Sequence, residues 1–167
     1  SRVTSQQIAP FAVLVLVLLA GTIVFGHSFA SGENLRNIAL DASYLLLIAT
    51  GMTFVIISGG IDLSVGSLLA LAGVLTAYGS RWGSVVAVLL PLVVCGLLGL
   101  VHGLLIGRAR IASFIVTLAG LLFARGLAFA VSQEGNRVYI IPADLTLTRV
   151  GQARLFHVGA PVWFALA

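Results

Sequence analysis

Lysine is absent from this chain, and charged residues of any kind are scarce. Only 8% of its 167 residues are charged, and arginine supplies all nine of its basic side chains. A P-loop needs a lysine after its glycines to reach the phosphates of a nucleotide, so the chain carries no such ATPase site. HExxH and GxSxG patterns are also missing. The sequence therefore predicts no catalytic residues and no bound cofactor.

Cysteine and methionine occur once each, as Cys95 and Met52. A single cysteine excludes an internal disulfide and a cysteine-based metal site. The three histidines, His27, His102 and His157, are far apart and form no pair at helical spacing, so we expect no metal site. His102 precedes Arg108 by about a turn and a half of helix, and its side chain is interpreted as reaching toward a membrane surface.

Apolar residues dominate what is present. They make up 60% of the chain, and the mean hydropathy is +1.16, whereas charged residues alone approach a quarter of a typical soluble domain. The expected solvent is a lipid bilayer. The net charge of +4 comes from arginines scattered between the apolar runs, which favours anchoring at membrane surfaces over a nucleic-acid partner.

The apolar runs predict an all-α, polytopic membrane helix bundle. About five transmembrane helices are expected, followed by the start of a sixth near Pro161. The third run is short for a full span, and a secretory signal peptide is the alternative interpretation of the first. Residues 132–159 form a long polar connection, interpreted as a loop, with a short hairpin as the alternative. The runs cover residues 8–26, 38–58, 64–79, 84–107 and 111–131.

Arginine positions favour one orientation of the bundle. The short basic loop at Arg108 and Arg110 is the densest positive point, and cytoplasmic loops carry the excess of such residues. The N-terminus, with Arg2, is therefore expected on the cytoplasmic side together with this loop.

A break interrupts the apolar pattern at residues 57–67, which read ISGGIDLSVGS. It predicts a broken helix or re-entrant turn at 58–67, because irregular backbone at membrane depth must lie against protein or water. Asp62 has two compatible interpretations, a cap that accepts from backbone N–H groups near Ser64 and Val65, or a group in a pathway or gate. The serines have a simpler role available, bonding back to nearby carbonyls. The candidate pathway residues here are Ser58, Gly59, Gly60, Asp62, Ser64, Gly66 and Ser67.

Small residues recur at helical spacing in two of the runs. Gly99, Gly103 and Gly107 form a smooth stripe of the GxxxG type, which predicts close helix packing. A similar face is formed by Gly66, Ala70, Gly73 and Ala77.

The fifth run contains an arginine at depth and a threonine near its start. Arg125 is interpreted as snorkelling toward the nearer membrane surface, with an ion pair to Glu134 or Asp62 as the alternative. Phe114 and Thr117 are interpreted first as core residues, and Thr117 is also a candidate for the pathway.

Two segments carry a resemblance to a known family. Residues 50–73, TGMTFVIISGGIDLSVGSLLALAG, closely resemble the signature region of sugar-importing ABC transporter permeases of the ribose, xylose and galactofuranose type. Residues 111–132, IASFIVTLAGLLFARGLAFAVS, resemble their next characteristic stretch. The likeness is greatest to the galactofuranose branch. Branched-chain amino-acid permeases are related but lack the GGIDLSVGS wording.

The resemblance implies a permease subunit of an ATP-driven importer that moves a monosaccharide across the bacterial inner membrane. Its implied partners are a cytoplasmic ABC ATPase, a second permease subunit of the same or a related kind, and a periplasmic sugar-binding protein. Family members are about twice as long, so residues 1–167 are expected to be one membrane permease domain, the N-terminal part of a longer chain without the coupling loop. The alternatives are an ion-coupled transporter with Asp62 as its coupling site, and a non-transporting membrane scaffold.

Overall fold

The structure, a computed structural model, describes residues 2–29, 31–155 and 158–166, which are almost entirely helical. His157 lies outside the described residues. Two short 3₁₀ turns, η1 (Gly26–Ser28) and η2 (Ser80–Trp82), connect helices, and two-residue strands β1 (Arg154–Leu155) and β2 (Val158–Gly159) pair antiparallel. The α-helices are α1 (Arg2–Phe25), α2 (Gly32–Ile57), α3 (Val65–Gly79), α4 (Ser84–Gly107), α5 (Ser113–Val131), α6 (Thr146–Gly151) and α7 (Ala160–Leu166).

Four helical segments of the described chain are long and apolar enough to cross a membrane: Ile8–Ser28, Gly32–Ile57, Ser84–Gly107 and Ser113–Val131. They correspond to four of the runs expected from the sequence, and the all-α membrane fold is confirmed. The remaining run, the third (64–79), forms α3, whose 15 residues rise only about 22 Å along the axis. This length is short of the ~30 Å hydrocarbon core, as the sequence indicated.

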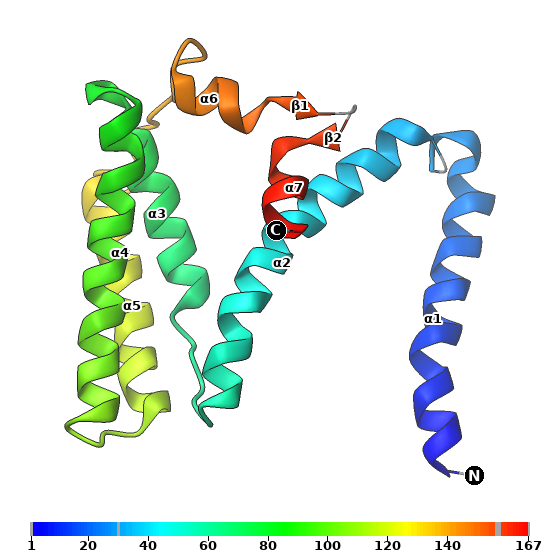
Figure 1. Ribbon diagram of the computed structural model, residues 1–167, viewed down its shortest axis with the longest axis horizontal. Coiled ribbons are helices and arrows are strands. Elements are labelled where there is room, and N and C mark those ends of the chain that lie inside the picture. The colour runs from blue at the N-terminus through cyan, green and yellow to red at the C-terminus, as the bar shows by residue number, and fades with distance from the viewer. Residues whose placement is uncertain (1, 30, 156–157, 167) are drawn as a thin grey trace.

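Helices α3, α4 and α5 pack into a bundle, with α4 antiparallel to the other two (Figure 1). Leu71 and Leu75 of α3 and Ala124 of α5 form its buried centre. Around them pack half-buried apolar side chains from all three helices. The short side chain of Ala124, which is fully buried, allows α5 to lie close to α3.

Helices α1 and α2 stand outside this bundle (Figure 1). Helix α2 packs against α7, and α1 contacts the η1 turn that follows it. The apolar side chains of α1 are broadly exposed, with Ile23 81% and Phe11 70% accessible. Such a surface suits lipid or further helices.

The connection between α5 and α7 differs from the expected loop. Residues 146–151 form α6, and a small hairpin joins Arg154–Leu155 to Val158–Gly159. The interpretation of 132–159 as a plain loop was wrong in its second half. The alternation in LTLT, which suggested a strand, falls at the start of α6, where Leu147 N–H donates to Ser84 Oγ on α4 at 3.3 Å.

The connections between the helices of the bundle lie at its two opposite ends (Figure 1). The α2–α3 break and the α4–α5 loop, with Arg108 and Arg110, lie at one end of the bundle, and the α3–α4 turn lies at the other. This arrangement is compatible with the basic loop and the break facing the same side of a membrane. The cytoplasmic placement of that side stays a prediction.

Candidate functional site

Helix α2 ends at the motif through a Schellman cap. Gly59 N–H donates to Ile56 O at 2.9 Å and Gly60 N–H donates to Val55 O at 3.0 Å, which is the paired pattern that satisfies the last carbonyls of a helix. Gly59 has φ +73°, a left-handed conformation that costs little only for glycine. The two glycines therefore end α2 where an apolar helix would otherwise continue.

The chain then runs without helix from Gly60 to Ser64 before α3 begins at Val65. The Asp62 carboxylate accepts from Ser64 N–H at 2.8 Å and from Ser64 Oγ–H at 2.6 Å. This Asx-type turn directs the backbone into the first turn of α3, where Leu68 N–H donates to Ser64 O at 2.9 Å. The capping geometry expected of Asp62 is present at Ser64, which is fully buried.

Helix α5 holds the middle of this non-helical segment. Ile61 N–H donates to Ser113 Oγ at 3.1 Å. Thr117 Oγ1 lies 3.1 Å from Ile61 O and 2.8 Å from Ser113 O, so its one hydroxyl proton is shared between two carbonyls. Because Thr117 is 3% exposed, it satisfies a backbone group that water does not reach easily.

A cavity of about 440 Å³ opens beside the break. Its size falls within the range of small-molecule sites. The polar groups that line it come from four parts of the chain: the end of α2, the break, the C-terminal part of α4 and the start of α5. They are Ser58, Asp62, His102, Ser113 and Thr117.

His102 lines this cavity and does not reach toward a surface, so that interpretation was wrong. Its imidazole lies directly against Gly120 of α5, where a Cβ would collide with it. The absence of a side chain at Gly120 therefore makes the space that lets the imidazole sit between α4 and α5. Its position adds a donor and an acceptor to the hydroxyl groups and the Asp62 carboxylate of the cavity.

Seven of the eight expected pathway residues divide between two hollows, whereas the eighth, the fully buried Ser64, lines neither. Ser58, Gly59, Gly60, Asp62 and Thr117 line the cavity beside the break. Gly66 and Ser67 line a groove between α3 and α5. Ser58 Oγ–H also bonds back to Val55 O at 2.7 Å, the simpler role that serines in membrane helices commonly have.

The glycine stripe on α4 borders the cavity. Gly99, Gly103 and Gly107 are exposed cavity-lining residues, and nothing in the described chain lies within 4 Å of a Cβ placed on any of them. No helix of the described residues packs on this stripe. The packing role of the stripe stays a prediction, and the helix that packs on it would have to lie outside the described residues.

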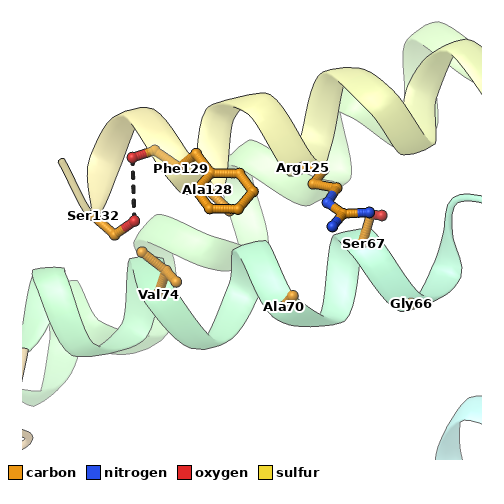
Figure 2. A pocket seen from close by; sticks show the side chains of 8 residues that line it. All are labelled: Gly66, Ser67, Ala70, Val74, Arg125, Ala128, Phe129 and Ser132. Carbon is orange, nitrogen blue, oxygen red and sulfur yellow. Dashed lines mark hydrogen bonds between the residues drawn. The ribbon is translucent and has the colours of Figure 1, made fainter. Parts of the chain in front are cut away.

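Figure 2 shows the groove between α3 and α5, about 370 Å³ in volume. The side chain of Arg125 crosses it from α5 toward Ser67 of α3 and does not point to the helix end at Ser132. Snorkelling toward that end was the wrong interpretation, because Cα–Cβ bonds in a helix tilt toward its N-terminus. Neither Glu134 nor Asp62 is among the groove-lining residues, and Ser132 Oγ–H bonds to Phe129 O at 3.1 Å.

Sequence reasoning missed Ser113 and His102 as cavity residues and gave Thr117 mainly to the core. Each of them stands on a helix distant in sequence from the break, so periodicity could not bring them to it. Phe114, also assigned to the core, is 51% exposed. One signal in the sequence could have indicated two of these cavity residues. Ser113 and Thr117 at the start of α5 are polar residues four positions apart, so they share one face of the helix.

The comparisons with known proteins give a consistent assignment. Residues 34–167 match the family described as "Branched-chain amino acid transport system / permease component". This match includes the break, α3, α4 and α5. No solved structure matches the chain.

The curated relatives are transporter permeases from Escherichia coli strain K12. The chain is 42% identical to the inner membrane ABC transporter permease protein YjfF, over 87% of this chain and 49% of that protein. It is 36% identical to the ribose import permease protein RbsC, over 95% and 50%. It is 31% identical to the xylose transport system permease protein XylH, over 93% and 41%.

The chain thus spans about half the length of the curated relatives it matches. Three observations point to a membrane permease: the four membrane-length helices, the interrupted helix and the family match over residues 34–167. The chain belongs to the family of permease components described for branched-chain amino acid transport systems, and its similar relatives include permeases named for sugars.

Proposed function

We propose that this chain is the transmembrane permease subunit of an ATP-driven ABC importer that carries a monosaccharide across the bacterial inner membrane. The observation that carries the proposal is the cavity at the interrupted helix, whose lining includes the hydroxyl groups of Ser58, Ser113 and Thr117, together with similarity to permeases named for ribose and xylose. Sugar hydroxyls need hydrogen-bonding partners more than countercharges. Ser58, Ser113, Thr117 and His102 offer such partners at one place.

The route in this proposal passes the α2–α3 break. Irregular backbone is tolerated at membrane depth where it borders protein or a water-filled space, and the break borders α5 and the cavity. Asp62 acts as the cap that sets the entry of α3, and the flanking glycines keep the backbone close to the cavity. Residues 1–167 work as one membrane permease domain.

The energy comes from another subunit in this account, since the sequence has no P-loop lysine. A cytoplasmic ABC ATPase would bind and hydrolyse ATP, a periplasmic binding protein would deliver the sugar, and a second permease subunit would complete the route. The open glycine stripe on α4 supports a further membrane helix at this surface.

Among sugars, we infer the galactofuranose type. The support is the amino-acid sequence of residues 50–73 and 111–132, which resembles the galactofuranose branch of these permeases most. Uptake of galactofuranose, ribose and xylose by the full-length transporter separates the three. Fastest uptake of ribose or xylose would overturn the finer assignment and leave the sugar-permease proposal standing.

Uptake into vesicles tests the proposal as a whole. The full-length protein, purified with its ATPase and reconstituted, is expected to give sugar uptake that requires ATP and is blocked by vanadate. Uptake that collapses with a protonophore and persists without the ATPase would favour the ion-coupled alternative, and no uptake at all would favour a scaffold. Against ion coupling stands the Asp62 carboxylate, which is already engaged by two donors of Ser64.

A further inference from the structure

Arg125 lies well inside a membrane-length helix, about two-thirds of the way along it. Helix α5 runs from Ser113 to Val131, so Arg125 is about 18 Å from its start and about 9 Å from its end at 1.5 Å per residue. Charged residues at such depth nearly always face a bundle interior or a water-filled cavity and mark ion or substrate pathways.

Among the described residues, none that lines the groove with Arg125 is acidic. The groove is lined by Gly66, Ser67, Ala70 and Val74 from α3 and by Arg125, Ala128, Phe129 and Ser132 from α5, with no carboxylate among them. Its polar groups besides the guanidinium are the two serine hydroxyls. The positive charge in this hollow is therefore not neutralised by a neighbouring acid of the groove.

The groove and the cavity beside the break share no lining residue, but both border the first turn of α3. Gly66 follows the Asp62–Ser64 turn by two residues, and nothing lies within 4 Å of a Cβ built on it. The first turn of α3 thus touches the cavity with Leu68 and the groove with Gly66 and Ser67. In the groove, the guanidinium of Arg125 lies beside Ser67, in this same first turn of α3 (Figure 2).

We propose that Arg125 is an electrostatic barrier that stops protons and metal cations from following the sugar along the groove between α3 and α5. This inference rests on the proposed function, because it needs a polar route. A guanidinium keeps its positive charge in proteins, and it repels a cation at close range in a low-dielectric site far more than in water. A neutral sugar meets no such repulsion and can accept hydrogen bonds from its N–H groups.

A route wide enough for a sugar is wide enough for water, so a transporter without such a barrier would leak protons while turning over. Single arginines exclude protons and cations from other polar pores by the same physics. The position of Arg125 well inside the helix, with no acid lining the groove, meets the requirement for this role.

The test is a proton-leak measurement on the full-length transporter with its ATPase, reconstituted in liposomes that contain a pH-sensitive dye. An imposed pH gradient drives proton entry, measured at rest and with ATP present. Arg125→Gln and Arg125→Met remove the charge, and Arg125→Lys keeps it. We expect the Gln and Met variants to admit protons on the order of tenfold faster or more, and the Lys variant to match the wild type.

Two outcomes would overturn the proposal: Gln and Met variants no leakier than the wild type, or a Lys variant as leaky as they are. Gel filtration and basal ATPase rate check that each variant is assembled. If the neutral variants fail to assemble, Ser67→Asp, which places an acid opposite the intact Arg125, takes their place and is expected to raise the leak. An unchanged leak there would equally contradict the barrier.

This measurement is separate from the test of the transporter itself. Absence of ATP-driven sugar uptake by the wild type would remove the proposed function. A wild type that transports sugar, with variants that leak no more than it does, would remove only the barrier.

Discussion

Thr117 on α5 donates to the carbonyl oxygen of Ile61, 3.1 Å away, across 56 positions of sequence. Ser113, one turn earlier, accepts from Ile61 N–H at 3.1 Å. Both backbone groups of one residue in the break are thereby satisfied by a single helix. The break is consequently a fixed structural element, held where a continuous helix would have needed no such partners.

Thr117→Val should weaken this attachment. Valine has nearly the same shape but no hydroxyl, so the Ile61 carbonyl loses its side-chain partner, at a cost of about 0.5–1.5 kcal/mol. The apparent melting temperature of the full-length protein in detergent is expected to fall by several degrees, and sugar uptake to fall with it. Thr117→Ser keeps the hydroxyl and should retain most of both. Equal stability of the Val and Ser variants would show that the hydrogen bond contributes nothing.

Gly59→Ala should destabilise the end of α2. Its φ of +73° costs a residue with a Cβ about 1–2 kcal/mol, although nothing nearby would collide with the added atom. The control is Gly66→Ala in the first turn of α3, which also has open space but ordinary helical φ. Thermal unfolding of both proteins checks the difference, and a Gly59→Ala protein as stable as the control would contradict the Schellman cap.

Asp62→Ala is expected to reduce uptake because Ser64 loses the acceptor for two hydrogen bonds. The cost should be near the ~1 kcal/mol typical of lost caps. Asp62→Asn keeps an acceptor oxygen and removes the charge, so it should transport nearly as well as the wild type. If the Asn variant fails as completely as the Ala variant in uptake assays at equal expression, the charge and not the cap is what matters.

Gly120→Ala should disturb the cavity through His102, which packs against this position of α5. The added methyl group would meet the His102 imidazole, and overpacking of this kind costs about 1–3 kcal/mol unless the ring moves. Gly126→Ala, on the same helix with open space around it, should be neutral or slightly stabilising. Melting temperatures of the two proteins give the comparison. A result in which both behave alike would mean that His102 does not occupy this position.

Most of the helices were predictable from the sequence, because each long apolar run by itself indicates a segment that lies in lipid. The limits of α4 follow from the turn at Trp82–Gly83 and the basic residue Arg108. The end of α2 was predictable as well, since a glycine such as Gly59 suits the left-handed conformation that a Schellman cap requires.

The composition of the site was only half predictable. Gly59, Gly60 and Asp62 predict the break from their own residue types. His102 lines the site only because Gly120, on another helix, leaves room for its imidazole. Such pairings depend on how α4 packs on α5, and no periodicity within one segment encodes that. Helix α6 escaped prediction for a related reason: its six residues make too few turns to show a period.

The central claim is that the break between α2 and α3 borders the route of the sugar. Ser58 lines the cavity there, so the most direct measurement is the reaction of Ser58→Cys, in a Cys95→Ser background, with a membrane-impermeant thiol reagent in the full-length transporter. We predict that the reagent labels Cys at this position and blocks uptake, and that transported sugar slows the labelling. A cysteine at position 58 that never reacts, or that reacts without affecting uptake, would contradict the account.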